Sequence, residues 1–178
     1  MILPPLVLVG LGTALVRGVF LGYPAKSVES ARLTAKEQAI VGAVADTLFP
    51  PGGPIPVSGT QAGLIQYMDD YVGRLPTQPA ILVRLLFQFI EHGPWIFGLK
   101  RRFTALSHGE RLEVLEGMRT SPIYFRRVAC LSMRAILTMG YLAHPDVARA
   151  MRVVPKTNPF GLGDEPCERR PQSPEEHP

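Results

Sequence analysis

The sequence predicts an all-α protein: a compact helical bundle with an apolar helix at its N-terminus and a disordered tail at its C-terminus. Three observations predict this class. Apolar residues recur at three- and four-residue spacing through most of residues 33–152. Residues suited to capping precede several of these runs. No stretch shows the strict alternation that is typical of a strand. At 178 residues, the chain has room for one core.

Residues 1–25 form the first unit. Residues 2–21 are apolar apart from Thr13 and Arg17, and about 20 mainly apolar residues suffice to cross a bilayer. We therefore expect a membrane anchor or a signal-like segment, and a membrane-associated protein whose body lies on the cytoplasmic or the periplasmic side. The alternative is a helix buried in the domain or in a partner interface, because short apolar runs are ambiguous.

The helical domain, residues 33–152, opens with a capping box. Thr34 and Glu37 have the required spacing, which predicts a helix that begins there. The Pro50-Pro51-Gly52 sequence ends this helix. A second, amphipathic helix is expected over 60–72, with Asp69 and Asp70 on a solvated face.

The third helix has Pro79 in its first turn and is apolar around most of its circumference, so we expect it at the centre of the bundle. A short helical segment should follow from Trp95 to Phe103. Ser107 and Glu110 repeat the capping-box spacing, which predicts a helix that extends to Met118.

Ser121-Pro122 is a cap residue followed by proline and predicts a long helix toward Tyr141. Pro145 opens a last short helix that ends near Met151. Residues 155–178 are rich in Pro, Glu, Arg and Ser, and we expect a disordered tail because they can bury little apolar surface.

No residue pattern indicates chemistry within this chain. The four histidines lack the spacing of a zinc site, and no glycine motif offers a seat for a nucleotide or a flavin. Basic residues are interspersed with acidic ones at a net charge of +4, which argues against a nucleic-acid partner. We therefore predict no catalytic, cofactor or metal site; a small enzyme that uses His108 or His144 is an alternative.

Aromatic and arginine side chains are favoured at binding hot spots. The candidate partner-binding residues on this basis are Phe49, Pro50, Trp95, Arg101, Arg102, Arg126, Arg127 and Tyr141. The arginine doublets have an alternative interpretation as exposed helix faces, and the aromatic residues have one as core residues.

The body of the chain resembles the gluconate 2-dehydrogenase small subunit family. Leu33-Thr34-x-x-Glu37 leading to Asp46-Thr47-Leu48-Phe49-Pro50 is similar to the opening signature of that family. Later pieces agree in order: Phe103-x-x-Leu106-Ser107, Glu110-Arg111-x-x-Val114-Leu115, Ser121 through Arg126-Arg127 to Tyr141, and Pro145-Asp146-Val147. The likeness covers 33–151 and extends to the N-terminal helical region of long-chain alcohol oxidases of the glucose-methanol-choline type.

This resemblance implies a non-catalytic accessory subunit. Its partner would be a larger FAD-dependent alcohol or sugar dehydrogenase or oxidase of the glucose-methanol-choline type, which carries the FAD and the catalytic residues. The subunit would support maturation, export or membrane attachment of that partner. The N-terminal run holds the lone Arg17 and no arginine doublet of the kind found in a twin-arginine export signal. Export with the partner therefore stays open. The alternative is a stand-alone membrane-associated helical binding or scaffold protein.

Overall fold

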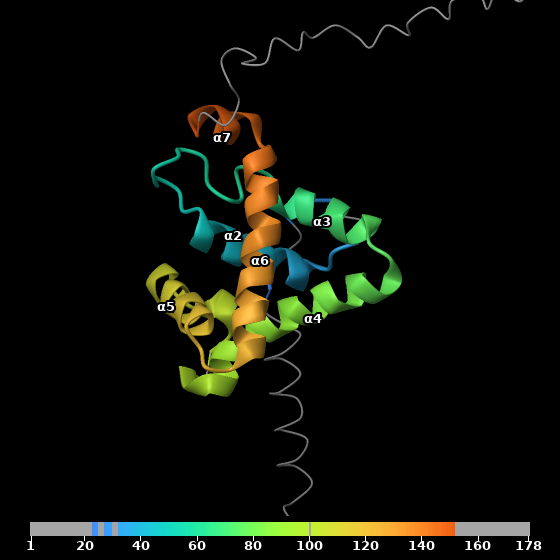
Figure 1. Ribbon diagram of the computed structural model, residues 1–178. Helices are drawn as coiled ribbons and strands as arrows, with labels where there is room; N and C mark the ends of the chain where they lie inside the picture. Colours follow the sequence, from blue (N-terminus) through green and yellow to red (C-terminus); the bar gives the residue numbers. More distant parts are fainter. Residues whose placement is uncertain (1–22, 25–26, 30–31, 100, 152–178) are drawn as a thin grey trace, which may run out of the picture.

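The computed structural model describes residues 23–24, 27–29, 32–99 and 101–151, with only the backbone of 96 and 97 (Figure 1). The elements in order are α2 (Ala35–Leu48), α3 (Leu64–Arg74), α4 (Thr77–Pro94), the π-helical turn η1 (Trp95–Leu99), the 3-10 turn η2 (Phe103–Ala105), α5 (His108–Arg119), α6 (Tyr124–Ala143) and α7 (Pro145–Ala150). The described residues contain no strand, which confirms the all-α class. The predicted apolar helix of 2–21 and the predicted tail of 155–178 lie outside the described residues.

Two helices organise the bundle. α2 and α6 each contact α3, α4 and α5. α6 runs along the length of the molecule, with α7 at one end and the η1 turn toward the other (Figure 1). The described elements share one core, and Ile40, Leu64, Phe87, Phe103 and Leu137 are among its fully buried side chains.

Both predicted capping boxes are confirmed. The Glu37 amide donates to Thr34 Oγ1 at 3.2 Å, and the Thr34 amide donates to Glu37 Oε2 at 2.8 Å. At the start of α5, the Ser107 amide donates to Glu110 Oε2 at 2.7 Å, and Ser107 Oγ accepts from the Glu110 amide. Each box satisfies backbone donors that a helix start leaves without an intrahelical partner, so the sequence locates both helix starts correctly.

Two helices begin later than the spacing predicts. Thr60 donates from its amide and its hydroxyl to the Asp46 carboxylate at 2.9 Å, which holds it in a turn, and α3 begins only at Leu64. Ser121 Oγ accepts from the amide of Ile123 at 3.2 Å, so it closes a local turn and α6 begins at Tyr124. In both cases a hydroxyl side chain stabilises a turn in place of the first helical residues.

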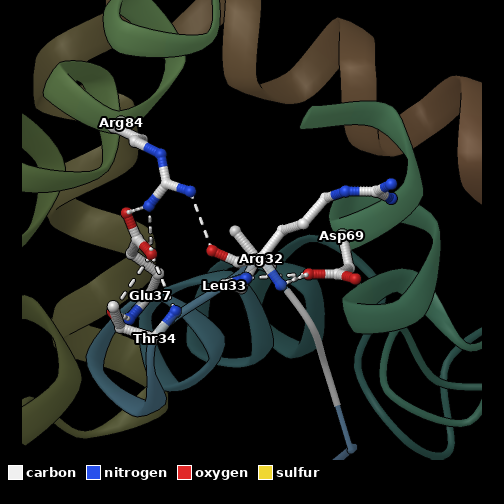
Figure 2. Close-up of polar contacts among 6 residues, drawn as sticks. All are labelled: Arg32, Leu33, Thr34, Glu37, Asp69 and Arg84. Atoms are coloured by element: carbon white, nitrogen blue, oxygen red, sulfur yellow. Dashed lines mark hydrogen bonds and ion pairs between the residues drawn. The ribbon is translucent and has the colours of Figure 1, made fainter. Parts of the chain in front are cut away.

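The prediction of a solvated face at Asp69 is wrong. Asp69 is only 3% exposed, and its Oδ1 accepts from the amides of Leu33 at 2.8 Å and Arg32 at 3.2 Å (Figure 2). The carboxylate supplies acceptors for backbone donors of the segment that enters α2. Its neighbour Asp70 is partly exposed and accepts from Gln66 Nε2 at 3.4 Å.

The prediction that the third helix is central is also wrong. α4 lies at the periphery of the bundle (Figure 1), and it buries only one side, where Phe87 and Ile90 are fully enclosed. On its other side, Ile81, Leu82 and Leu85 are 51%, 66% and 58% exposed. The helix is apolar around its circumference because it has two apolar faces, and the described part of the chain covers one of them.

Candidate partner-binding surface

A continuous apolar surface runs along the outside of α4 to the start of α6. Ile81, Leu82, Leu85 and Phe89 lie on one side of α4, because residues three and four positions apart share a helix face. The Phe89 ring meets the exposed Phe125 ring edge-on, with centroids 4.9 Å apart. We name these five residues the α4 face.

A cavity of about 200 Å³ lies beside the α4 face, at the junction of α4, η1, α5 and α6. Phe89, Leu99 and Met118 are among its apolar lining residues, and Glu113 and Arg126 are among its polar ones. The cavity makes the surface concave next to an exposed aromatic ring, a shape that suits a protruding side chain of a partner.

The α4 face carries no charge of its own. α4 and α6 are described in full, and neither exposes an acidic side chain, since Glu91 is fully buried and α6 contains none. Arg84 turns away from this face to pair with Glu37. Exposed apolar patches of this kind mark sites of protein or membrane interaction in soluble domains.

The predicted partner-binding residues in and after η1 differ in exposure. Trp95 is 55% exposed in η1. Arg101 is exposed and forms an ion pair with Glu110. Arg102 is partly buried, and its guanidinium lies 4.5 Å from the centre of the Tyr23 ring. Trp95 and Arg101 are therefore accessible to a partner.

The arginine doublet at the start of α6 has mainly local contacts. Arg127 Nη1 donates to the carbonyl oxygens of Ser121 at 2.7 Å and Pro122 at 3.1 Å. Its guanidinium also lies 5.7 Å from the centre of the Tyr124 ring. Arg126 is partly buried and lines the cavity beside the α4 face. Of the two, Arg126 is the better placed for contact with a partner.

Phe49, Pro50 and Tyr141 lie in a different part of the molecule. The Phe49 and Tyr141 rings stack with centroids 3.9 Å apart and an interplanar angle of 8°. Tyr141 is 3% exposed, and its hydroxyl donates to the carbonyl oxygen of Val57 at 2.5 Å. Phe49 and Pro50 are partly buried. The core interpretation therefore accounts for Phe49 and Tyr141, and the eight residues do not form one surface.

Among the described residues, the most completely buried charged side chain is Glu91, and its contacts are structural. Its Oε1 accepts from the hydroxyls of Tyr23 and Thr104, each at 2.7 Å, and its Oε2 accepts from the Thr104 amide at 3.1 Å. Burial and the bond to Glu91 raise the pKa of Tyr23 well above its usual range. The carboxylate joins α4, η2 and the chain at Tyr23, and at 0% exposure it is closed to a substrate.

Two further titratable groups lie near Glu91. Lys36 Nζ is 3.1 Å from His92 Nε2. Burial lowers the pKa of both side chains, and their mutual repulsion adds to the effect at His92. Of the alternative catalytic histidines, His108 is exposed at the first residue of α5, and His144 separates α6 from α7. Among the described residues, no three His, Cys, Asp or Glu side chains gather as metal ligands would.

No described helix combines the length and the apolar character needed to cross a bilayer. Comparisons with protein-family models, with curated proteins and with solved structures each found no match. The α4 face is the feature that sequence reasoning missed. Its signal was present in the third helix, because a helix that is apolar on all sides lies either at the centre of a bundle or at an interface.

Proposed function

We propose that this chain is a non-catalytic accessory subunit whose α4 face binds a larger FAD-dependent oxidoreductase of the glucose-methanol-choline type. The subunit supports the maturation, export or membrane attachment of that partner. The observation that carries this proposal is the α4 face, where Leu82 and Leu85 are more than half exposed beside the exposed ring of Phe125. A partner surface that covers this face would remove the apolar side chains from water.

The resemblance supports the identity of the partner, and the residues that carry it have structural contacts in this fold. Glu37 closes a capping box and pairs with Arg84, and Asp46 accepts from Thr60. Arg111 donates to the carbonyl oxygens of Phe103 at 3.2 Å and Thr104 at 2.7 Å. These residues fix helix ends and loops, so the positions that carry the resemblance have structural roles in this fold.

The expected contribution of the α4 face follows from its exposed area. Burying a whole Leu side chain stabilises a complex by about 1.5–3 kcal/mol. Because more than half of Leu82 and of Leu85 is available for burial, truncating both to Ala should cost about 2 kcal/mol of binding free energy. This corresponds to a roughly 30-fold rise in Kd.

Affinity isolation of the full chain from its native cells tests the proposal. We expect a larger polypeptide with FAD to co-purify and give a yellow preparation, while the chain released from it is colourless. A Leu82→Asp and Leu85→Asp double variant should lose the flavin, because binding would bury two carboxylates without partners. Met139→Asp is the matched control, since Met139 is similarly exposed but lies near the far end of α6.

Either of two results would reject the proposal: a chain that is recovered alone, or flavin recovery that the double variant leaves unchanged. The second candidate function is a stand-alone membrane-associated binding or scaffold protein, which the apolar composition of residues 2–21 favours. Recovery of the chain with membranes in the absence of any flavoprotein would favour this second function.

A further inference from the structure

We infer that the end of the molecule that carries Tyr23, η1, Arg101 and Arg102 lies against an anionic lipid bilayer. We name this surface the η1 end and define it by Tyr23, Trp95, Arg101 and Arg102. The inference deepens the proposed function and rests on its membrane attachment. It assigns to the lipid a surface separate from the α4 face, so that one side binds the flavoprotein while the η1 end contacts the membrane.

The first argument is the place where the apolar run joins the described body. Residues 2–21 are apolar enough for a bilayer, and Tyr23 follows two positions later. Two residues span roughly 7 Å at most, and the headgroup layer on each side of a bilayer is about 5–7 Å thick. A run that is inserted to residue 21 therefore places Tyr23 in or next to the headgroups.

The second argument is that Tyr23 is fastened to the body next to η1. Its hydroxyl donates to Glu91 Oε1 at 2.7 Å, and Glu91 is fully buried in α4, one turn before Trp95. The Arg102 guanidinium lies 4.5 Å from the centre of the Tyr23 ring. These contacts hold Tyr23 beside α4 one turn before η1, so a bilayer that contacts Tyr23 also approaches η1.

The third argument is the chemistry of the exposed side chains at this end. Trp95 is 55% exposed, and tryptophan is enriched at the interface between membrane and water. Arg101 is exposed, and Lys and Arg near the surface are attracted to anionic lipids. Its ion pair with Glu110 is partly exposed, so it is weak and can yield to a lipid phosphate.

Trp95 is the only tryptophan of the chain, so its fluorescence reports on this surface without any substitution. The full chain would be reconstituted into vesicles of phosphatidylglycerol and phosphatidylcholine, with and without lipids brominated near the headgroup. We expect the chain to float with the vesicles, its emission to shift to the blue, and the brominated lipid to quench at least half of the emission. Replacing phosphatidylglycerol by phosphatidylcholine should reduce the quenching at least two-fold.

A variant with Trp95→Phe and Met139→Trp is the matched control, because it moves the reporter to an exposed position near the far end of α6. This variant should float equally and remain unquenched. A chain that floats while Trp95 emits as in buffer would overturn the inference and leave membrane attachment standing. A chain that fails to float would overturn both the lipid contact of the η1 end and the membrane attachment. Flavoprotein binding, measured on the same samples, tests the accessory role separately.

Discussion

The Arg84→Met substitution removes a polar clamp that fastens the start of α2 to α4. Arg84 Nη1 donates to both carboxylate oxygens of Glu37, at 2.6 and 2.8 Å, and its Nη2 donates to the carbonyl oxygen of Arg32 at 2.8 Å (Figure 2). Breaking a buried ion pair costs about 3–5 kcal/mol. The Arg84 side chain is 36% exposed, and Glu37 keeps its bonds to Thr34, so we expect a smaller loss of about 2 kcal/mol.

Thermal and urea denaturation of the full chain, followed by circular dichroism, would measure this loss. A loss of about 2 kcal/mol lowers the Tm of a domain of this size by roughly 8 °C. Arg84→Lys should be intermediate, because a single ammonium group replaces the planar guanidinium. The control is Arg149→Met, whose ion pair with Asp146 is largely exposed and should contribute less than about 0.5 kcal/mol. Equal stability of Arg84→Met and Arg149→Met would refute the clamp.

Three further substitutions probe other contacts. Tyr141→Phe removes the bond to the Val57 carbonyl and should lower the free energy of unfolding by about 1 kcal/mol, measured by urea titration; an unchanged midpoint would show that this bond contributes nothing. Gly59→Ala places a Cβ 2.5 Å from the carbonyl group of Ala45 and should lower the free energy of unfolding by about 1–3 kcal/mol. An unchanged Tm in thermal melting would show that the backbone adapts freely. Burial lowers the pKa of His92 below its usual 6.5, so the unfolded chain binds the proton more tightly. The stability that neutral His92 contributes is therefore fully present above about pH 6.5, the value of the unfolded chain, and is lost as the pH falls below it through the lower pKa of the folded protein. In His92→Gln, this part of the pH–stability curve should become flatter, and a curve that coincides with the wild type would contradict the assignment.

Local signals in the sequence located most helices, because the interactions that define a helix start are made within a few residues. The capping box of Thr34 and Glu37 is such a case, and so is the proline that opens α7. Asp69 differs because its partners lie more than thirty residues away in the chain, at Arg32 and Leu33. No periodicity in the helix that contains Asp69 could indicate that these donors exist.

The sequence selected partner-binding candidates by residue type alone, and none of them belongs to the α4 face. Residue type alone selected Trp95 and Arg101, which are exposed, together with Tyr141, which stacks on Phe49 inside the fold. Sequence could not separate these cases, because Phe49 follows α2 and Tyr141 lies in α6, far apart in the chain. The α4 face was missed because periodicity shows where apolar residues lie on a helix but not which of them the neighbouring helices cover.

The heat-capacity change on association of the purified chain with its flavoprotein tests most directly whether the α4 face is buried in the complex. Calorimetric titration at several temperatures should give a clearly negative value, as burial of apolar surface requires. The heat-capacity change should be smaller in magnitude for the double variant with Leu82→Ala and Leu85→Ala. The Tm of the isolated double variant should be nearly unchanged. The same heat-capacity change and the same Kd for both proteins would contradict the account.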